Sequence, residues 1–194
     1  MIRLAQRHVD WVLGFADEVW WSRFAQPSLH AWTEEEPLHL QELVKEKADT
    51  EAKALACYGL LRRDTSQILL RFVTGRPVSS VTIDFLQWLI ERLRDVGKKA
   101  LLLVWDNASW HISKQVRHWL KEHNRRARRS GDVRIVVCQL PTKSPWLNPI
   151  EPHWVHGKRA IVEPDRVLSK QEVMQRVCDY YGCNLTEPLA QHPS

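Results

Sequence analysis

The chain has 194 residues, 44% of them apolar, and its 28 Lys and Arg against 23 Asp and Glu give a net charge of +5 and a pI of about 9.2. A chain of this length buries roughly 70% of the surface that its unfolded form exposes, which is enough for one domain without disulfide bonds. The longest apolar runs, Ala54–Leu61 and Ala100–Trp105, are far shorter than the roughly 18 residues that cross a bilayer. We therefore expect a cytoplasmic protein without membrane contact.

Three apolar stretches in the first half of the chain predict strands. Val9–Ala16 stops at the acidic pair Asp17-Glu18, and we expect these acids to end the strand. Ala54–Leu61 and Ile68–Thr74 are separated by a short polar segment, which is typical of a hairpin.

Helices and strands alternate in the second half. Apolar residues recur at helical spacing from Val81 to Val96 and predict a helix that stops at Gly97. The continuous apolar run Ala100–Trp105 then predicts a strand buried on both faces. Ser113–His123 predicts a second helix with Ser113 as its cap, and Val133–Cys138 predicts another strand.

The last fifty residues begin with a proline-rich segment. Pro141–Pro152 holds four prolines and predicts a loop that opens a helix near Glu151. A capping box at Ser169 predicts a last helix through about Tyr181. We expect an α/β domain over residues 1–183, with a five-stranded sheet between helices, and a loose tail over residues 184–194.

Positive charge is concentrated between Lys121 and Arg134, where six basic and two acidic residues supply +4 of the net charge. We expect an exposed loop whose arginines contact the phosphates of a nucleic acid. The alternative is a solvated helix end that only favours solubility. The candidate DNA-binding residues of this segment are Lys121, Arg125, Arg126, Arg128 and Arg129.

Three acidic residues, Asp17, Asp106 and Glu151, are candidate metal ligands. Asp17 and Asp106 follow apolar strands, and chemistry in α/β sheets gathers at the carboxyl ends of strands. Converging carboxylates raise one another's pKa unless a cation lies among them, and oxygen ligands favour Mg²⁺ or Mn²⁺. Two such ions can promote in-line displacement at a phosphodiester. An acid at a strand end is also commonly a helix cap or a solvent-facing loop residue.

Two motifs carry a family resemblance. Asp106-Asn-Ala-Ser-Trp-His111 and the segment Leu140–Trp154 resemble the D-N-x-x-x-H and L-P-x-x-S-P-x-L-N-P-I-E-x-x-W motifs of the DDE superfamily endonucleases. These are the catalytic domains of bacterial insertion-sequence transposases related to the mariner group. The pair Asp17-Glu18, followed by Pro27 and Trp32, is similar to the family's first acidic motif. The resemblance spans nearly the whole chain.

The resemblance implies an RNase H-like fold, with a central mixed sheet flanked by helices. It also implies that Asp17, Asp106 and Glu151 are catalytic and bind two divalent ions, Mg²⁺ or Mn²⁺. The reaction would be hydrolysis at transposon DNA ends, followed by attack of the freed 3′-hydroxyl on target DNA, by a protein that is a homodimer when active. The residues expected from the two motifs to shape the site or contact the double-stranded DNA are Asn107, His111, Lys143, Ser144 and Asn148.

The chain departs from the family pattern at two places. Glu151 follows Asp106 by 45 residues, which is longer than usual, and the excess coincides with the basic segment. Only eight residues precede Val9, where family members carry a helix-turn-helix region. We therefore expect one part of a split gene, with a separately encoded N-terminal DNA-binding protein, or a remnant. An inactive remnant that only binds DNA and a related structure-specific nuclease are the alternative functions.

Overall fold

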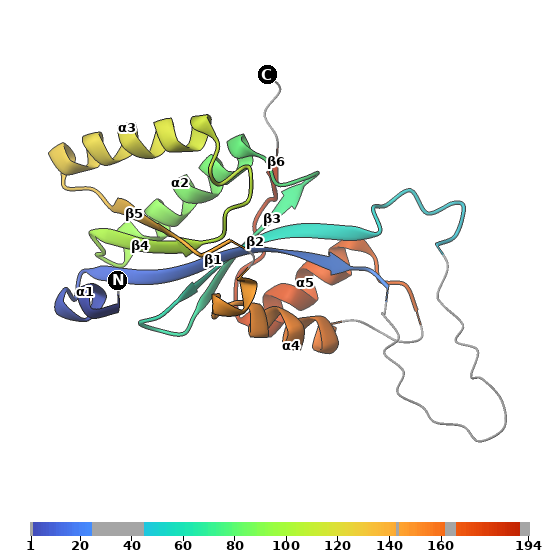
Figure 1. Cartoon of the computed structure of the whole chain (residues 1–194). Coiled ribbons are helices and arrows are strands. Elements are labelled where there is room, and N and C mark those ends of the chain that lie inside the picture. Colours follow the sequence, from blue (N-terminus) through green and yellow to red (C-terminus); the bar gives the residue numbers. More distant parts are fainter. Residues whose placement is uncertain (1, 25–44, 143, 162–165, 191–194) are drawn as a thin grey trace.

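The computed structural model describes residues 2–24, 45–142, 144–161 and 166–190 (Figure 1). The predicted Pro27, Trp32 and Lys143 lie outside these residues. The elements in chain order are α1 (Ile2–Arg7), β1 (Trp11–Ser22), β2 (Ala54–Arg62), β3 (Ile68–Thr74), α2 (Ser79–Asp95), β4 (Ala100–Trp105), α3 (Lys114–Ser130), β5 (Arg134–Gln139), the 3₁₀ turn η1 (Pro145–Leu147), α4 (Glu151–Ile161), α5 (Lys170–Tyr181) and β6 (Leu189–Ala190).

These elements form one mixed sheet with the strand order β5-β4-β1-β2-β3-β6. The pairs β1–β4, β4–β5 and β3–β6 are parallel, whereas β2 runs antiparallel to both β1 and β3. The expected α/β sheet and the hairpin are confirmed, but the sheet has six strands rather than five. The sixth strand comes from the segment expected to be a loose tail, because Leu189 pairs with Val73. The sheet therefore extends beyond the boundary expected at residue 183.

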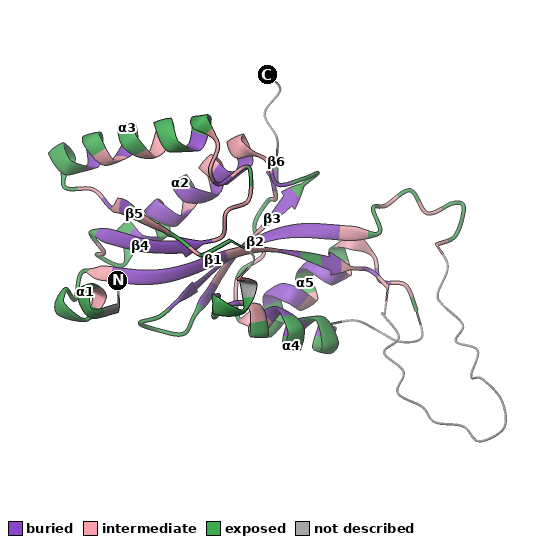
Figure 2. Cartoon of the chain, viewed as in Figure 1, coloured by how far each residue is buried: buried purple, intermediate pink, exposed green. Residues whose placement is uncertain are grey.

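Helices cover both faces of the sheet, and each face has its own hydrophobic core (Figure 2). On one face, α2 and α3 pack against side chains such as Val12, Leu101 and Trp105. On the other face, α4 and α5 pack against side chains such as Phe15 and Val104. The side chains of one strand alternate between the two cores because successive residues of a strand point to opposite faces.

The first strand is longer than the sequence pattern predicted. The acids Asp17 and Glu18 do not end β1, which continues to Ser22 through antiparallel pairs with β2. The continuation is stabilised by Val19 and Trp21, whose side chains are 3% and 1% exposed. Two buried apolar residues at alternate positions after the acids therefore outweigh the unfavourable strand propensity of Asp and Glu.

The basic segment is also not the exposed loop that was predicted. It continues helix α3 as far as Ser130, and Gly131 ends the helix with a left-handed φ of 72°. His123 and Ala127 extend the buried stripe of the helix beyond the predicted end, at the spacing that one face of a helix requires. Arginine has a high helix propensity, so a run of arginines lengthens a helix that is already anchored by its apolar face.

The termini of the helices follow the predicted capping signals. Ser113 Oγ accepts a hydrogen bond from the Val116 N–H, and Ser169 and Glu172 form a complete capping box at the start of α5. Gly97, just after α2, has a left-handed φ of 72°. Across the described parts of the chain, no helix combines the length and the apolar character that a membrane crossing requires.

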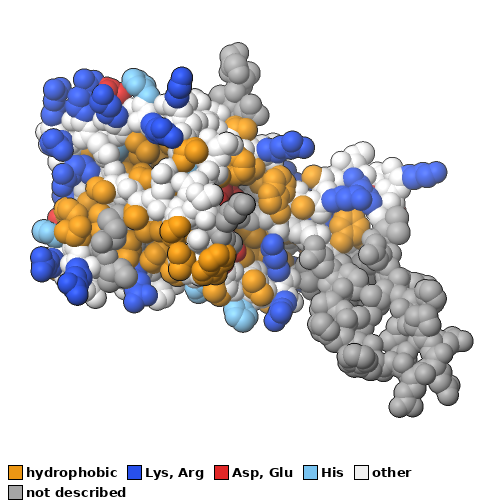
Figure 3. All heavy atoms as spheres, in the orientation of Figure 1, with side chains coloured by type: hydrophobic (Ala, Val, Ile, Leu, Met, Phe, Trp, Pro, Cys, Tyr) orange, Lys and Arg blue, Asp and Glu red, His pale blue; other side chains and the backbone are white. Residues whose placement is uncertain are grey.

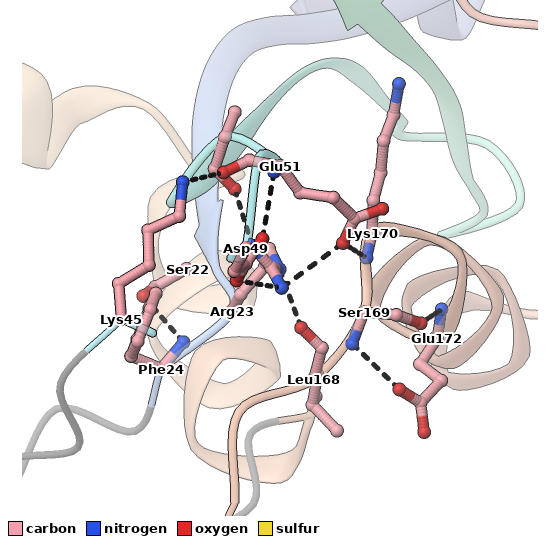
Figure 4. Close-up of polar contacts among 11 residues, drawn as sticks. Ser22, Arg23, Phe24, Lys45, Asp49, Glu51, Leu168, Ser169, Lys170 and Glu172 are labelled. Atoms are coloured by element: carbon pink, nitrogen blue, oxygen red, sulfur yellow. Dashed lines mark hydrogen bonds and ion pairs between the residues drawn. The ribbon is translucent and has the colours of Figure 1, made fainter. Parts of the chain in front are cut away.

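A buried arginine joins three separate parts of the chain at the far end of β1 (Figure 4). The Arg23 side chain is 5% exposed, and its Nε donates to the Leu168 carbonyl at 2.6 Å. Its guanidinium also pairs with Asp49 at 2.8 Å and with Glu51 at 3.2 Å, and Glu51 accepts from the Lys170 N–H. The Arg23 cluster therefore ties the end of β1 to the approach to β2 and to the start of α5.

Candidate active site

The two aspartates lie side by side in the strand register. The last pair of the β1–β4 ladder is Phe15 with Val104, and Asp17 and Asp106 are each two residues further along. Phe15 and Val104 both belong to the core beneath α4 and α5. Because side chains repeat their direction every two residues along a strand, Asp17 belongs to that same face. Asp106 is the first residue after the end of β4.

The third carboxylate is brought to this face by the start of α4. Glu151 is the first residue of the helix, and its N–H donates to the Asn148 carbonyl at 3.1 Å. Asn148 is 3% exposed, and its Nδ2 donates to the carbonyl of Ala16, the neighbour of Asp17, at 3.0 Å. Ile150 is completely buried. The proline-rich loop is thus fixed to β1 just before Glu151, by a contact 132 residues apart in the chain.

Helix α4 also contacts Asp17 directly. Trp154, one turn after Glu151, donates a hydrogen bond from its indole Nε1 to Asp17 Oδ2 at 2.9 Å. Room for the indole ring is provided by Gly59, the residue opposite Asp17 on β2, because a Cβ there would lie 2.6 Å from Trp154 Cζ2. The tryptophan of the predicted motif is therefore a buried support for the first aspartate.

The charge on Asp17 is unfavourable in this environment. Burial raises its pKa most, the neighbouring carboxylates of Glu151 and Glu18 raise it further, and the pKa reaches about 7. The hydrogen bond from Trp154 lowers the pKa but does not compensate. A carboxyl group shifted by burial and by like charges is typical of a functional site, since folding alone gains nothing from it.

Asp106 is held in a different way. Its Oδ1 accepts from the Ala108 N–H at 2.9 Å and lies 2.8 Å from Nδ1 of His111, while its side chain is 49% exposed. The hydrogen bond with His111 lowers the pKa of Asp106 below its ordinary value. Among the described residues, none donates to the other carboxylate oxygen, Oδ2. Asp106 is therefore ionised, fixed through one oxygen and open through the other.

His111 connects Asp106 to Glu18, which lies on the opposite face of β1 from Asp17. Its Nε2 lies 2.6 Å from Glu18 Oε1, and its ring stacks on Trp105 with centroids 4.3 Å apart. Burial alone would lower the pKa of His111, but the hydrogen bonds and charges of Asp106 and Glu18 outweigh it and raise the pKa to about 9. The imidazolium therefore bridges two carboxylates.

The three predicted ligands have the chemistry of a hard-cation site. Asp17, Asp106 and Glu151 supply only carboxylate oxygens, the donors that Mg²⁺ and Mn²⁺ prefer. Burial, and then the carboxylates of Glu151 and Glu18, raise the pKa of Asp17, so its charged form lacks a compensating partner. Among the described residues, no group of three or more His, Cys, Asp or Glu side chains is arranged so that it could hold a metal ion. By the chemistry of their oxygens, the three residues fit a divalent cation.

The residues of the two motifs that were expected to contact DNA mostly contact the protein itself. His111 and Asn148 are each 3% exposed, so their side chains do not form the DNA surface that was predicted for them. Asn107 is half-buried and donates from Nδ2 to the Leu140 carbonyl at 2.6 Å. Ser144 is half-buried beside the 3₁₀ turn, where its Oγ donates to the Thr142 carbonyl. Their common role is to shape the loops around the carboxylates.

The predicted basic residues lie elsewhere. All five are exposed on the second half of α3, which ends beside the start of β5, at the amino ends of the parallel strands: Lys121, Arg125, Arg126, Arg128 and Arg129. Lys and Arg side chains gather at this end of the molecule, on the left in Figure 3. The structure therefore places Asp17 and Asp106 toward the carboxyl ends of the parallel strands β1 and β4 and the arginines near the amino ends.

Glu18 was considered only as a neighbour of Asp17, and sequence reasoning did not find its partners. Its Oε1 also accepts from the Trp110 indole at 3.2 Å, 92 residues away in the chain. Strand alternation was the available signal, because it places Glu18 on the same face as Trp105, five residues before Trp110.

Comparisons with known proteins identify the family of the chain. A family model described as DDE superfamily endonuclease matches residues 27–174, a range that includes Asp106 and Glu151 and begins after Asp17. A search among curated proteins finds no match.

Solved structures share the fold. A Mos1 transposase paired-end complex with the left transposon end has a TM-score of 0.62 at 16% identity, over 94% of this chain and 52% of that one. Mos1 paired-end complexes with Mn and with Mg give TM-scores of 0.60 and 0.61 at 14% and 15% identity, over 94% and 93% of this chain and 52% and 50% of theirs. The chain thus spans about half the length of these transposases and has their RNase H-like fold. By the family match over most of its length, the chain belongs to the DDE superfamily endonucleases.

Proposed function

We propose that the chain is the catalytic domain of a transposase that hydrolyses phosphodiester bonds at transposon DNA ends and joins the freed 3′-hydroxyl to target DNA. The observation that carries this proposal is the environment of Asp17, which accepts a hydrogen bond from Trp154 of α4 and whose pKa is raised by burial and by the neighbouring carboxylate of Glu151. It is supported by the family match and by the likeness to Mos1 complexes solved with transposon ends.

Asp17, Asp106 and Glu151 are the residues that would hold two Mg²⁺ or Mn²⁺ ions. When bound, such ions supply activation of the attacking oxygen and stabilisation of the leaving oxygen. The chain itself positions the ligands: Trp154 orients Asp17, the loop bond from Asn148 to Ala16 aims Glu151, and Asp106 keeps Oδ2 free. Each ligand comes from a different rigid element, which favours a preorganised site.

The proposed partner is double-stranded DNA, both as transposon ends and as target. The exposed basic residues of α3 supply the phosphate contacts, and the active form is proposed to be a homodimer. We further propose that the protein acts in the cytoplasm. Residues 1–183 hold all the proposed catalytic residues of this domain.

Cleavage of a plasmid tests the proposal without knowledge of the terminal repeats. Supercoiled DNA incubated with the full chain and Mn²⁺ should be nicked, and EDTA should stop the reaction. Asp106→Asn should retain DNA binding and lose nicking, because the neutral amide is a poor metal ligand. Equal nicking by Asp106→Asn and the unchanged chain, with matched purification, would reject the assignment.

A second function, DNA binding without cleavage, is favoured by one observation. The basic residues of α3 are exposed at the opposite end of the sheet from the carboxylates, so they can bind DNA whether or not the site is active. For this remnant, affinity should fall steeply with salt concentration while Mn²⁺ produces no nicks. Nicking that Asp106→Asn abolishes would eliminate the remnant.

A further inference from the structure

We infer that Glu18 is a positioning residue that acts through His111 to fix Asp106, so that one oxygen of Asp106 is held by the protein and the other is presented to a metal ion. The inference rests on the proposed function, because it assigns a support to one of the proposed metal ligands. Of the two roles expected for His111, shaping the site or contacting DNA, it develops the first.

The geometry of the imidazole carries the first step. Nδ1 of His111 lies 2.8 Å from Asp106 Oδ1, and Nε2 lies 2.6 Å from Glu18 Oε1, so both ring nitrogens are occupied. The ring is 3% exposed and lies parallel to Trp105, with an interplanar angle of 7°. A ring fixed on its face and at both nitrogens has no freedom to turn, so it holds Asp106 Oδ1 in one place.

Glu18 is in turn fixed by the fold. Its side chain is 9% exposed, and its Oε1 also accepts the Trp110 indole hydrogen at 3.2 Å. Because Glu18 points to the opposite face from Asp17, it does not join the three carboxylates. A buried carboxylate that contacts a metal ligand only through a histidine has the arrangement of the outer partners that orient ligands in metalloproteins.

The consequence for Asp106 concerns its two oxygens. Oδ1 receives hydrogen bonds from both the Ala108 N–H and His111, which leaves Oδ2 as the oxygen with no protein donor among the described residues. Loss of the histidine bond would free the side chain to rotate, since half of its surface is open to solvent. The metal ion would then have to order the Asp106 side chain on binding, which weakens its affinity.

The test is a titration of the full chain with Mn²⁺ alone, without DNA. Binding is detected by calorimetry or by the electron paramagnetic resonance signal of free Mn²⁺. His111→Asn places an amide nitrogen near the position of Nδ1 and keeps a donor for Asp106, whereas His111→Gln reaches toward Glu18 and loses that donor. His111→Gln should weaken Mn²⁺ binding by about 10- to 100-fold. His111→Asn should weaken Mn²⁺ binding less than His111→Gln does. Equal affinities of the two variants would overturn the inference.

Coupling between Glu18 and His111 provides the second readout. Glu18→Ala should weaken Mn²⁺ binding by about 10-fold. In the His111→Gln background the same change should cause no further loss, because Glu18 acts only through the ring. If the double variant instead loses Mn²⁺ affinity by the product of the two single losses, Glu18 acts independently of His111 and the inference is contradicted. Glu18→Gln keeps a hydrogen-bonding group of the same size and should retain most of the Mn²⁺ affinity. It replaces Glu18→Ala in this test if that variant does not fold.

His123 offers a matched control on the same protein. It is also buried and stacks on a tryptophan, Trp119, with centroids 5.1 Å apart, but its Nε2 bonds to the Val133 carbonyl. His123→Gln should therefore leave Mn²⁺ affinity unchanged. Asp106→Asn separates the two claims: if it abolishes Mn²⁺ binding while His111→Gln leaves the Mn²⁺ affinity unchanged, only the positioning role fails. If Asp106→Asn has no effect, the proposed function fails as well.

Discussion

The two ends of the central strands place acidic side chains in opposite electrostatic environments. At the amino end, hydrogen bonds from Arg94 lower the pKa of Asp132, and those from Arg62 and Lys98 outweigh burial to lower the pKa of Asp64. At the carboxyl end, burial and neighbouring carboxylates raise the pKa of Asp17 to about 7. The two acids of the first end pair with basic side chains, whereas Asp17 at the second end is raised in pKa by burial and by other carboxylates.

The largest effect expected from this difference is a gain of stability on neutralising Asp17. Its pKa is about 7 in the folded chain against 3.8 in the unfolded chain, so the folded state loses stability as the pH rises between these values. Asp17→Asn removes that loss and still offers an oxygen to Trp154. In EDTA at pH 8, urea denaturation should show a gain on the order of a few kcal/mol, and this gain should vanish near pH 4.

The sign of this change is the informative part. Asp17→Asn should also abolish Mn²⁺ binding and nicking, so stability and function would move in opposite directions at one residue. A variant that is less stable than the unchanged chain at pH 8 would show that the charge of Asp17 is satisfied within the protein.

A somewhat smaller effect is expected at Gly59, which makes room for Trp154 beside Asp17. A Cβ there would lie 2.6 Å from Trp154 Cζ2, a rigid ring atom, so Gly59→Ala must displace the indole from Asp17. Overpacking of this kind costs about 1–3 kcal/mol. Chemical denaturation measures that cost, and Mn²⁺ titration should show weaker binding because Asp17 loses its orienting donor.

Gly14 is the matched control for this experiment. It also lies in the centre of the sheet, and a Cβ there would meet the Cδ1 atoms of Leu60 at 2.7 Å and Leu101 at 3.0 Å, which are flexible side-chain ends. Gly14→Ala should therefore cost stability with little change in Mn²⁺ affinity. Equal losses of Mn²⁺ affinity in the two variants would show that Trp154 does not orient Asp17.

At the basic end, the expected effect is on DNA affinity and its salt dependence. Arg128→Ala with Arg129→Ala removes two exposed arginines from the end of α3. If both contact phosphates, the slope of log affinity against log salt should fall by about 1.8, at roughly 0.9 for each contact. Fluorescence anisotropy with a labelled duplex measures this slope. Mn²⁺ affinity should not change, because the carboxylates lie at the other end of the sheet.

The control for the arginines removes the same charge elsewhere. Arg76→Ala with Arg92→Ala also deletes two exposed arginines, outside α3. A fall in the salt slope as large as that of the α3 variant would mean that net charge, rather than the end of α3, determines DNA binding.

Local patterns in the sequence were sufficient for much of the fold. The strand Ala100–Trp105 has the predicted bounds, and the caps at Ser113 and Ser169 start the predicted helices. These signals are contained within a few consecutive residues. The motif around Glu151 likewise predicted a loop followed by a helix, because prolines restrict the backbone there.

The supports of the site depend on contacts that no local pattern contains. Trp154 bonds to Asp17 across 137 residues, and His111 bonds to Glu18 across 93. The length of β1 was missed for the same reason, because pairing with β2 stabilises strand residues that are individually poor strand formers. The identity of the carboxylates was predictable, but the residues that orient them become visible only when the strands are paired.

The smallest effect is expected for the paired acid at the amino end. Arg94 binds both oxygens of Asp132, at 2.9 and 2.6 Å, but its side chain is 54% exposed, so solvent screens the pair. Arg94→Gln should lower the free energy of unfolding by no more than about 1 kcal/mol at neutral pH.

The pH dependence of this cost follows from Asp132. Because Asp132 has a lowered pKa when folded, the stability that it gains from Arg94 is present above its unfolded pKa of 3.8 and is lost as the pH falls through its folded pKa. Urea denaturation at pH 7 and at pH 3, with and without 1 M NaCl, should show the cost become smaller in acid and in salt. A cost as large as the gain from Asp17→Asn would mean that the charges of both ends contribute equally to folding, and the contrast between a paired end and an uncompensated end would be lost.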